Sequence, residues 1–145
     1  MTACTGSPGG GGHVREEVPL IRVLIADDQD FIRRGVRAAL SEEQDIEVCA
    51  EAIDGGDALA KSLQFRPDVI IMDIVMPRMD GIDAIRLLRK ALPNAKILTL
   101  SQYDVPEMVK EAEKAGASAY LSKLLIWDKL IPYVRRVQHS ETFFS

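Results

Sequence analysis

Short apolar runs alternate with amphipathic stretches over most of the chain. Five runs of four to six residues are mostly apolar, and this pattern predicts strands that are buried on both faces. The expected strands are residues 21–26, 47–51, 68–72, 96–100 and 118–121. After each run, apolar residues recur at intervals of three and four, which predicts helices. The expected helices are residues 31–40, 54–63, 82–92, 104–116 and 126–138.

Some details of these helices can also be predicted. The apolar set of the first helix is Phe31, Ile32, Val36, Ala39 and Leu40. Asp104, with Glu107 three residues later, indicates a capping box at the start of the fourth helix. Gly116 is the residue type that commonly ends a helix, so we expect the fourth helix to stop there.

Five strands that alternate with five helices predict an α/β fold, a parallel sheet with helices on both faces. In such sheets the chemistry gathers at the carboxyl ends of the strands. The polar residues that follow the expected strands are Asp27, Asp28, Asp73, Ser101, Ser122 and Lys123. Three carboxylates, hydroxyl groups and an ammonium group are therefore expected at one edge of the sheet.

Each of these residues has an ordinary structural explanation as a turn, capping or surface residue. Their coincidence at one edge favours a site instead. Three carboxylates held together repel one another, and a hard divalent cation with oxygen ligands, such as Mg²⁺, removes that conflict. A carboxylate beside such an ion can attack phosphorus, and Lys123 and Ser101 would then stabilise the charge on a transferring phosphoryl group.

Composition narrows the possibilities further. The chain has 145 residues, of which 47% are hydrophobic, and this size and content suit one domain with a core of its own. No apolar run approaches the ~20 residues of a membrane-spanning helix. Cys4 and Cys49 are too few for a disulfide framework or a four-ligand zinc site. The net charge of −4 argues against binding nucleic-acid phosphate through the domain's own field.

The N-terminal residues differ from the rest of the chain in composition. Five of the ten glycines fall within the first twelve residues, so residues 1–19 are predicted to form a flexible leader. The ordered domain is expected to span residues 20–138. The leader lacks the apolar stretch of a secretory signal, and we therefore expect a cytoplasmic location.

The residues at the expected strand ends resemble those of response-regulator receiver domains of two-component signalling. The matching motifs are Asp27-Asp28, the segment Asp73 to Gly81 with the sequence DIVMPRMDG, Ser101 and Lys123, and the likeness covers residues 21–137. The resemblance implies a flavodoxin-like (βα)5 fold with the strand order 2-1-3-4-5.

The resemblance also implies roles for individual residues. Asp73 would accept a phosphoryl group from a sensor histidine kinase. Mg²⁺ would be bound by Asp28, Asp73 and the backbone carbonyl of Val75, with Asp27 acting mostly through water. Ser101 and Lys123 would contact the phosphoryl group. Tyr120 matches the aromatic residue whose orientation reports the switch.

A subfamily resemblance adds expectations about output. Residues 115–123 and 136–145 resemble receivers that precede a LuxR-type helix-turn-helix output domain, so residues 139–145 are expected to begin a linker. The output domain itself is absent from this sequence, and the chain alone is not expected to bind specific DNA. A role in transcription regulation and a homodimer are implied. A truncated regulator and a natural receiver-only protein both remain open.

Several residues depart from the family pattern. Leu124 stands where the family has a proline or, in this subfamily, an aspartate, and residues 124–127 are unusually apolar. Pro132 falls inside the expected last helix, which it would tend to break. Trp127 either packs into the core or, if exposed, anchors self-association.

Two other classes of function can be weighed against a phosphorylated receiver. Aspartate-nucleophile phosphatases normally carry a second aspartate two residues after the nucleophile, where this chain has Val75. We therefore expect no enzyme activity beyond self-catalysed phosphoryl acceptance and slow autodephosphorylation. A receiver that only docks proteins, without phosphorylation, would normally have lost one of the acidic residues or the lysine. This chain keeps all the acidic residues and the lysine.

Overall fold

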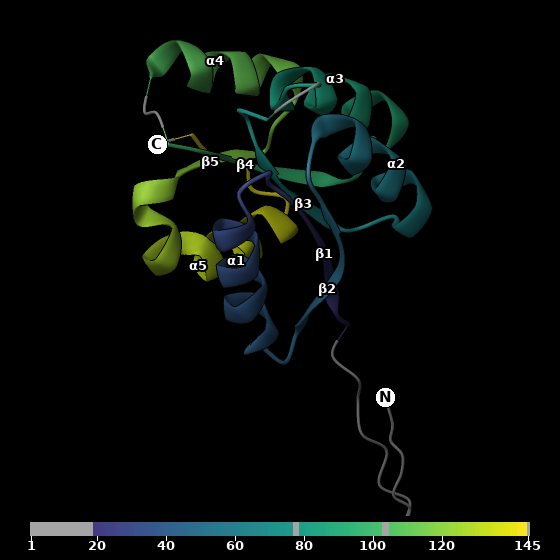
Figure 1. Cartoon of the computed structure of the whole chain (residues 1–145), viewed down its shortest axis with the longest axis vertical. Coiled ribbons are helices and arrows are strands. Elements are labelled where there is room, and N and C mark those ends of the chain that lie inside the picture. The colour runs from purple at the N-terminus through teal and green to yellow at the C-terminus, as the bar shows by residue number, and fades with distance from the viewer. Residues whose placement is uncertain (1–18, 77–78, 103–104, 145) are drawn as a thin grey trace, which may run out of the picture.

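The computed structural model describes residues 19–76, 79–102 and 105–144 of the chain. Within these residues lies a parallel sheet of five strands in the order β2-β1-β3-β4-β5, so the predicted α/β fold is confirmed (Figure 1). The strands are β1 (Ile21–Ala26), β2 (Ile46–Ala52), β3 (Val69–Asp73), β4 (Lys96–Ser101) and β5 (Ala119–Ser122). The α-helices are α1 (Asp30–Ser41), α2 (Gly55–Phe65), α3 (Gly81–Ala91), α4 (Pro106–Ala115) and α5 (Ile126–Gln138). A 3-10 turn, η1 (Lys123–Leu125), joins β5 to α5.

Helices cover both faces of the sheet. α1 and α5 pack on one face, and α2, α3 and α4 pack on the other (Figure 1). Successive residues of a strand point to opposite faces, so Val23 and Ile25 contact the α1–α5 side while Leu24 contacts the α2–α4 side. The central strands β1, β3 and β4 are buried almost throughout, which explains why their sequences are nearly continuous apolar runs.

Each strand begins and ends within one residue of its predicted position. The small differences matter at the carboxyl ends, because Asp73, Ser101 and Ser122 are the last residues of their strands rather than the first residues of loops. Each still lies in the ladder, with Asp73 opposite Leu100 and Ser101 opposite Ser122. The backbone of these polar residues is therefore held by the sheet.

The predicted N-cap of α4 is wrong by one residue. Asp104 lies outside the described residues, and the N-cap position falls on Val105, which makes no side-chain capping bond. Pro106 is the first helical residue. Proline is favoured at this position because the N–H that it lacks would have no hydrogen-bond partner within the helix. The predicted end is confirmed, since Gly116 caps α4 with a left-handed φ of 115°.

Two large side chains of α1 and α5 are not buried as core residues. Phe31 is 78% exposed because it precedes the buried Val36 by five residues, which is about 140° around the helix axis. Trp127 is 53% exposed, and one side of its ring lies over Gly35 of α1. A Cβ at Gly35 would come within 2.5 Å of that ring, so a larger residue there would require the Trp127 ring to move.

The predicted last helix is confirmed in spite of Pro132. The proline is exposed, while Leu130 and Val134 on either side of it are buried and hold both halves of α5 against the sheet. Of the apolar stretch 124–127 noted in the sequence, Leu124 and Leu125 of η1 are exposed, whereas Ile126 is fully buried.

The chain turns back onto the sheet edge after α5. Phe143 forms an isolated parallel bridge with Ala119, and its N–H donates a hydrogen bond to the carbonyl of Ser118 at 2.9 Å. Its ring lies edge-on to Tyr133, with centroids 4.8 Å apart, and 3.5 Å from the guanidinium carbon of Arg136. The described part of the segment that was predicted to begin a linker thus packs against β5 and α5.

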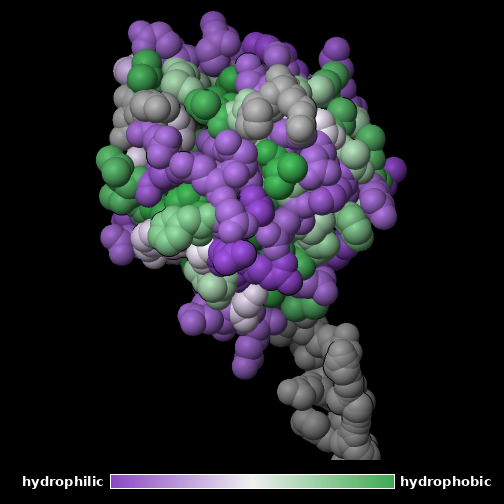
Figure 2. Space-filling model, viewed as in Figure 1, coloured by the Kyte–Doolittle hydropathy of each residue, from purple (hydrophilic) through white to green (hydrophobic). Residues whose placement is uncertain are grey.

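The outer surface is mixed in polarity. Figure 2 shows hydrophilic residues over much of one face, interrupted by small apolar groups. None of the helices in the described ranges combines the length and the apolar character that crossing a bilayer would require.

Candidate functional site

The predicted acidic residues meet at the carboxyl end of the sheet. Asp27 and Asp28 follow β1, and Asp73 ends the neighbouring strand β3. One carboxylate oxygen from each of the three lies within 4.8 Å of the others. Asp27 and Asp73 are buried, whereas Asp28 is exposed. The cluster therefore has a closed inner side and an open outer side.

Lys123 supplies positive charge to the buried side of this cluster. Its Nζ lies 2.8 Å from Asp27 Oδ2 and 3.2 Å from Asp73 Oδ2. It also donates to the side-chain oxygen of Gln29 at 2.9 Å. The Lys123 side chain is only 6% exposed, so one cation stands against two carboxylates with little help from water.

Each polar atom of Asp27 has its own partner. Its N–H donates to the carbonyl of Ala52 at 3.0 Å, and its Oδ1 accepts from the N–H of Gln29 at 2.8 Å. Its carbonyl accepts from Arg33 Nη1 at 2.9 Å. Oδ2 is paired with Lys123 by distance, but it is buried and accepts no hydrogen bond of good geometry. A bound cation close to Asp27 Oδ2 would satisfy this buried oxygen.

The environment of Asp73 disfavours its ionised form. Burial raises the pKa of the Asp73 carboxyl to about 6, and the negative charge of Asp27 acts in the same direction. The charge and hydrogen bond of Lys123 and a bond of 3.3 Å from the N–H of Val75 only partly oppose this rise. Additional positive charge at the cluster would stabilise the carboxylate.

These observations fit a hard divalent cation. The ligand atoms are carboxylate oxygens, which Mg²⁺ prefers, and the open side next to Asp28 leaves room for water. Val75 lies two residues after Asp73, in the loop after β3, so its carbonyl stays a predicted ligand.

A glycine allows the loop after β3 to fold tightly. The N–H of Gly81 donates to the carbonyl of Ile74 at 2.7 Å, and a Cβ at Gly81 would lie 2.4 Å from the carbonyl oxygen of Asp73. α3 can therefore begin directly beside the residue at the end of β3. This close approach gives a physical reason for the glycine that ends the DIVMPRMDG motif.

The remaining predicted residues lie on β4 and β5. Ser101 is buried at the end of β4, next to the strand position that pairs with Asp73. Tyr120 is buried on β5 and belongs to the core on the α2–α4 side. Ser122 accepts a hydrogen bond from the N–H of Leu124 at 3.2 Å, so it caps η1. The ordinary explanation holds for Ser122.

Sequence reasoning missed two residues that contact this site, Gln29 and Arg33. Gln29 directly follows the acidic pair, but a glutamine in a loop has no pattern that predicts a bond to a distant lysine. Arg33 lies one turn into α1, where an arginine resembles any solvated helix residue. Their contacts arise only when β1, α1 and η1 come together.

Comparisons with known proteins show which family this chain resembles. A family model described as the response regulator receiver domain matches residues 23–135. The chain is 43% identical over 124 residues to YxjL, an uncharacterized transcriptional regulatory protein of Bacillus subtilis (strain 168), with 86% of this chain and 57% of YxjL covered. It is 36% identical over 125 residues to the response regulator protein VraR of Staphylococcus aureus (strain NCTC 8325 / PS 47), with 86% and 60% covered.

A solved structure shows the same fold. The two-component response regulator of the LuxR family from Aurantimonas sp. SI85-9A1 aligns with a TM-score of 0.82 at 27% identity, covering 87% of this chain and 89% of that one. The chain spans less than two thirds of the length of the two curated relatives. The similarity to those relatives therefore concerns their receiver-like part.

Proposed function

This chain belongs to the family of response-regulator receiver domains of two-component systems, and on that premise we propose that Asp73 accepts a phosphoryl group from a sensor histidine kinase. The observation that carries the proposal is the buried contact of Asp73 with Lys123, beside the second carboxylate of Asp27. The family resemblance also implies that this reaction takes place in the cytoplasm.

The proposed reaction transfers a phosphoryl group from an imidazole nitrogen of the kinase to a carboxylate oxygen of Asp73. A carboxylate oxygen of Asp73 attacks phosphorus, and the bond from phosphorus to the imidazole nitrogen of the kinase breaks. The electron pair of that bond stays on the nitrogen, and an aspartyl phosphate forms. Lys123, whose Nζ is 3.2 Å from Asp73 Oδ2, is then close enough to contact the new phosphoryl oxygens.

Asp28, Asp73 and the carbonyl of Val75 are the residues we propose for holding Mg²⁺, with Asp27 acting mostly through water. The ion would supply positive charge beside the transferring phosphoryl oxygens. The clustered oxygens and the raised pKa of Asp73 support this assignment. Asp28→Ala should remove Mg²⁺ binding, and Asp27→Ala should weaken it less.

Ser101 and Tyr120 are the proposed switch residues. Once Asp73 carries a phosphoryl group, the Ser101 hydroxyl donates a charge-assisted hydrogen bond to it and draws the end of β4 inward. Tyr120 is already buried in this structure, so the switch would exchange this orientation with an outward one. The affected face is formed by α4, β5 and α5.

This face is the proposed route to output. Phosphorylation would promote a homodimer through it, and a LuxR-type domain in a longer protein would bind DNA in response. Sedimentation with and without beryllofluoride tests the first step: a heavier species with the mimic is expected, and identical distributions over a wide concentration range would contradict it. Ser101→Ala should weaken this coupling while Asp73 still accepts phosphate.

We do not assign a turnover activity on external substrates to the domain. Phosphatases with an aspartate nucleophile use a second acid two residues later. Here that residue is Val75, whose side chain has no acid or base group to move a proton. Slow loss of the domain's own phosphoryl group is the only hydrolysis proposed.

Labelling with acetyl phosphate and Mg²⁺ tests the phosphoacceptor directly. Intact-mass measurement should find one added phosphoryl group on the wild type and none on Asp73→Asn. Asp128→Asn, at an exposed aspartate of α5, is the matched control and should be labelled like the wild type. An unlabelled wild type, or a fully labelled Asp73→Asn variant, would refute the proposed function.

A further inference from the structure

The backbone of the acidic loop is held from two sides. On one side, the N–H of Asp27 donates to the carbonyl of Ala52 on β2 at 3.0 Å. On the other, the carbonyl of Asp27 accepts from Arg33 Nη1 at 2.9 Å. This carbonyl belongs to the peptide unit that joins Asp27 to Asp28. Its direction therefore fixes where the backbone of Asp28 lies.

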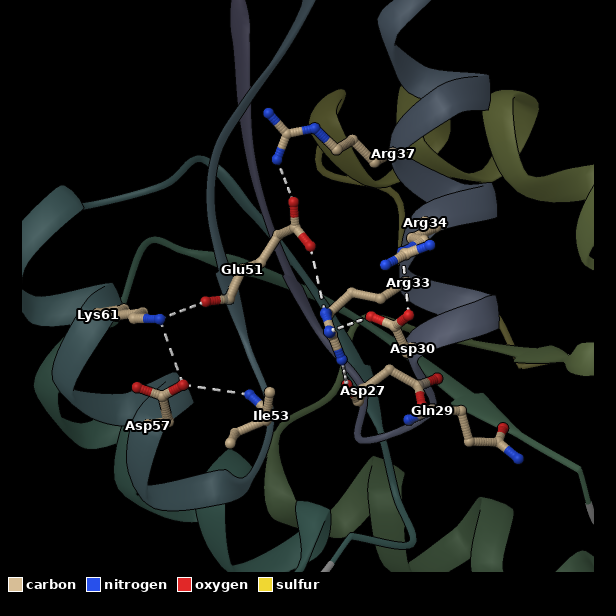
Figure 3. Close-up of polar contacts among 10 residues, drawn as sticks. All are labelled: Asp27, Gln29, Asp30, Arg33, Arg34, Arg37, Glu51, Ile53, Asp57 and Lys61. Atoms are coloured by element: carbon tan, nitrogen blue, oxygen red, sulfur yellow. Dashed lines mark hydrogen bonds and ion pairs between the residues drawn. The ribbon is translucent and has the colours of Figure 1, made fainter.

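Arg33 is itself fixed by two carboxylates. Its Nε lies 3.2 Å from Oε1 of Glu51 on β2, and its Nη2 lies 2.8 Å from Oδ1 of Asp30 at the start of α1 (Figure 3). The side chain is 15% exposed. All three guanidinium nitrogens thus point to oxygens, a use of the planar fork that a lysine could not reproduce.

The anchor at Glu51 is firmly attached to the sheet. Glu51 pairs with Ile25 in the ladder between β1 and β2. Its carbonyl accepts from Lys61 Nζ of α2 at 2.6 Å, and Lys61 also lies 3.3 Å from Asp57 Oδ2 (Figure 3). Arg33 therefore links the acidic loop to a part of β2 that α2 holds in place.

Two neighbouring arginines share these carboxylates without reaching the loop backbone. Arg34 pairs with Asp30, and Arg37 pairs with Glu51. Figure 3 shows Arg37 directed to Glu51 and away from Asp27. Among the contacts of the described residues, Arg33 alone of these three arginines donates to the carbonyl of Asp27.

We infer that Arg33 is a positioning residue for the metal-binding loop. By holding the carbonyl of Asp27, it sets the direction of the Asp27–Asp28 peptide and hence the place of the Asp28 carboxylate beside Asp73. The inference rests on the proposed function, because it assigns Asp28 to the metal. Loss of Arg33 should then reduce metal affinity and leave the chemical step largely intact once the metal is bound.

The test compares Arg33→Gln with Arg37→Gln. Both changes remove one positive charge and one partner of Glu51 from the same helix, but only the first removes the bond to the carbonyl of Asp27, together with a bond to Asp30 that Arg34 also makes. The measured quantities are the Mg²⁺ concentration that half-saturates labelling of Asp73 by acetyl phosphate and the rate at saturating Mg²⁺. Isothermal titration of Mg²⁺ gives the affinity without any reaction.

Arg33→Gln should raise the half-saturating Mg²⁺ concentration roughly tenfold, since residues that orient metal ligands typically contribute on that scale. The rate at saturating Mg²⁺ should stay within about twofold of the wild type, and Arg37→Gln should match the wild type in both quantities. Arg33→Lys keeps the charge but loses the fork, so it should resemble Arg33→Gln.

Three results would overturn the inference. They are equal Mg²⁺ responses of Arg33→Gln and Arg37→Gln, full recovery in Arg33→Lys, and a lower saturated rate without a change in half-saturation. If Arg33→Gln does not fold by circular dichroism, Glu51→Gln replaces it and should raise the half-saturating concentration by a smaller factor; an unchanged value there also refutes the inference. Normal labelling of the wild type in these experiments leaves the proposed function standing.

Discussion

Two regions of the molecule combine one cation with two carboxylates and differ mainly in their exposure to water. At the carboxyl end of the sheet, Lys123 lies 2.8 and 3.2 Å from Asp27 and Asp73. Where α5 meets the connection between α1 and β2, Arg135 lies 2.7 and 2.8 Å from Glu43 and Asp45. The side chain of Lys123 is 6% exposed, and that of Arg135 is 41% exposed.

The two groups titrate in opposite directions. Burial, reinforced by the charge of Asp27, raises the pKa of Asp73 to about 6 in spite of Lys123. At the exposed group, the hydrogen bond from Arg135 lowers the pKa of Asp45. At similar distances, a carboxyl pKa is thus shifted upward in the buried group and downward in the exposed group. Exposure to water decides between them.

The largest effect is expected from removing the buried cation. Lys123→Met leaves Asp27 and Asp73 without a counter-charge, so the free energy of unfolding at pH 7 in chelator should fall by about 3 kcal/mol. Urea denaturation measures this change. Arg135→Met is the control and should cost less than half as much. An equal loss in both variants would show that exposure does not separate the two groups.

Neutralising the buried acid should have the opposite sign. Asp73→Asn removes a charge whose burial is unfavourable, and the shift of its pKa from 3.8 to about 6 corresponds to a gain of about 3 kcal/mol in chelator at pH 7. Thermal and urea unfolding should both detect the gain. A destabilised Asp73→Asn variant would mean that attraction to Lys123 outweighs burial.

The raised pKa of Asp73 also sets how the stabilisation by Asp73→Asn depends on pH. Because the folded pKa of Asp73 is raised, the folded state binds the proton more tightly between about pH 4 and pH 6, and the penalty of the charged form disappears as the pH falls through this window. The stability difference between Asp73→Asn and the wild type should shrink by about 1 kcal/mol from pH 7 to pH 5. Unfolding at several pH values checks this, and a constant difference would contradict the raised pKa.

The smallest effect is expected at the exposed group. Asp45→Asn should cost less than about 1 kcal/mol, because the ion pair is partly screened by solvent. The folded pKa of Asp45 is lowered, so its contribution is present above about pH 4 and is lost as the pH falls further. Adding 1 M NaCl should reduce this cost while leaving the Lys123→Met effect largely unchanged. If salt does not change the stability cost of Asp45→Asn, the Asp45 ion pair behaves like the buried group instead.

The sequence predicts the composition of the buried group better than its electrostatics. Asp27, Asp73 and Lys123 come at or near the ends of apolar runs that predict buried strands, and parallel strands bring their carboxyl ends together. The same reasoning does not predict how deeply each carboxylate is buried. The exposure of Asp28 beside the burial of Asp27 depends on the turn of the backbone after β1.

Contacts between elements escape a pattern-based prediction. Phe31 belongs to the apolar set of α1 in the sequence, yet it faces solvent because its angle on the helix differs from that of Val36. Trp127 and Gly35 come together only through the packing of α5 on α1. Gln29 and Arg33 reach the site through such contacts as well, so they carry no signal in their own neighbourhoods.

The bridge at Phe143 has a consequence for the solubility of the domain. A sheet with two open edges offers unpaired N–H and carbonyl groups to strands of other molecules, which promotes aggregation. The β2 edge carries the charged residues Glu47 and Glu51, and the pairing of β2 with β1 contains a register shift that disturbs a flat edge. The β5 edge is instead covered by the chain itself, through the bond from Phe143 to Ser118. Removing Phe143 would expose that edge to intermolecular strand pairing.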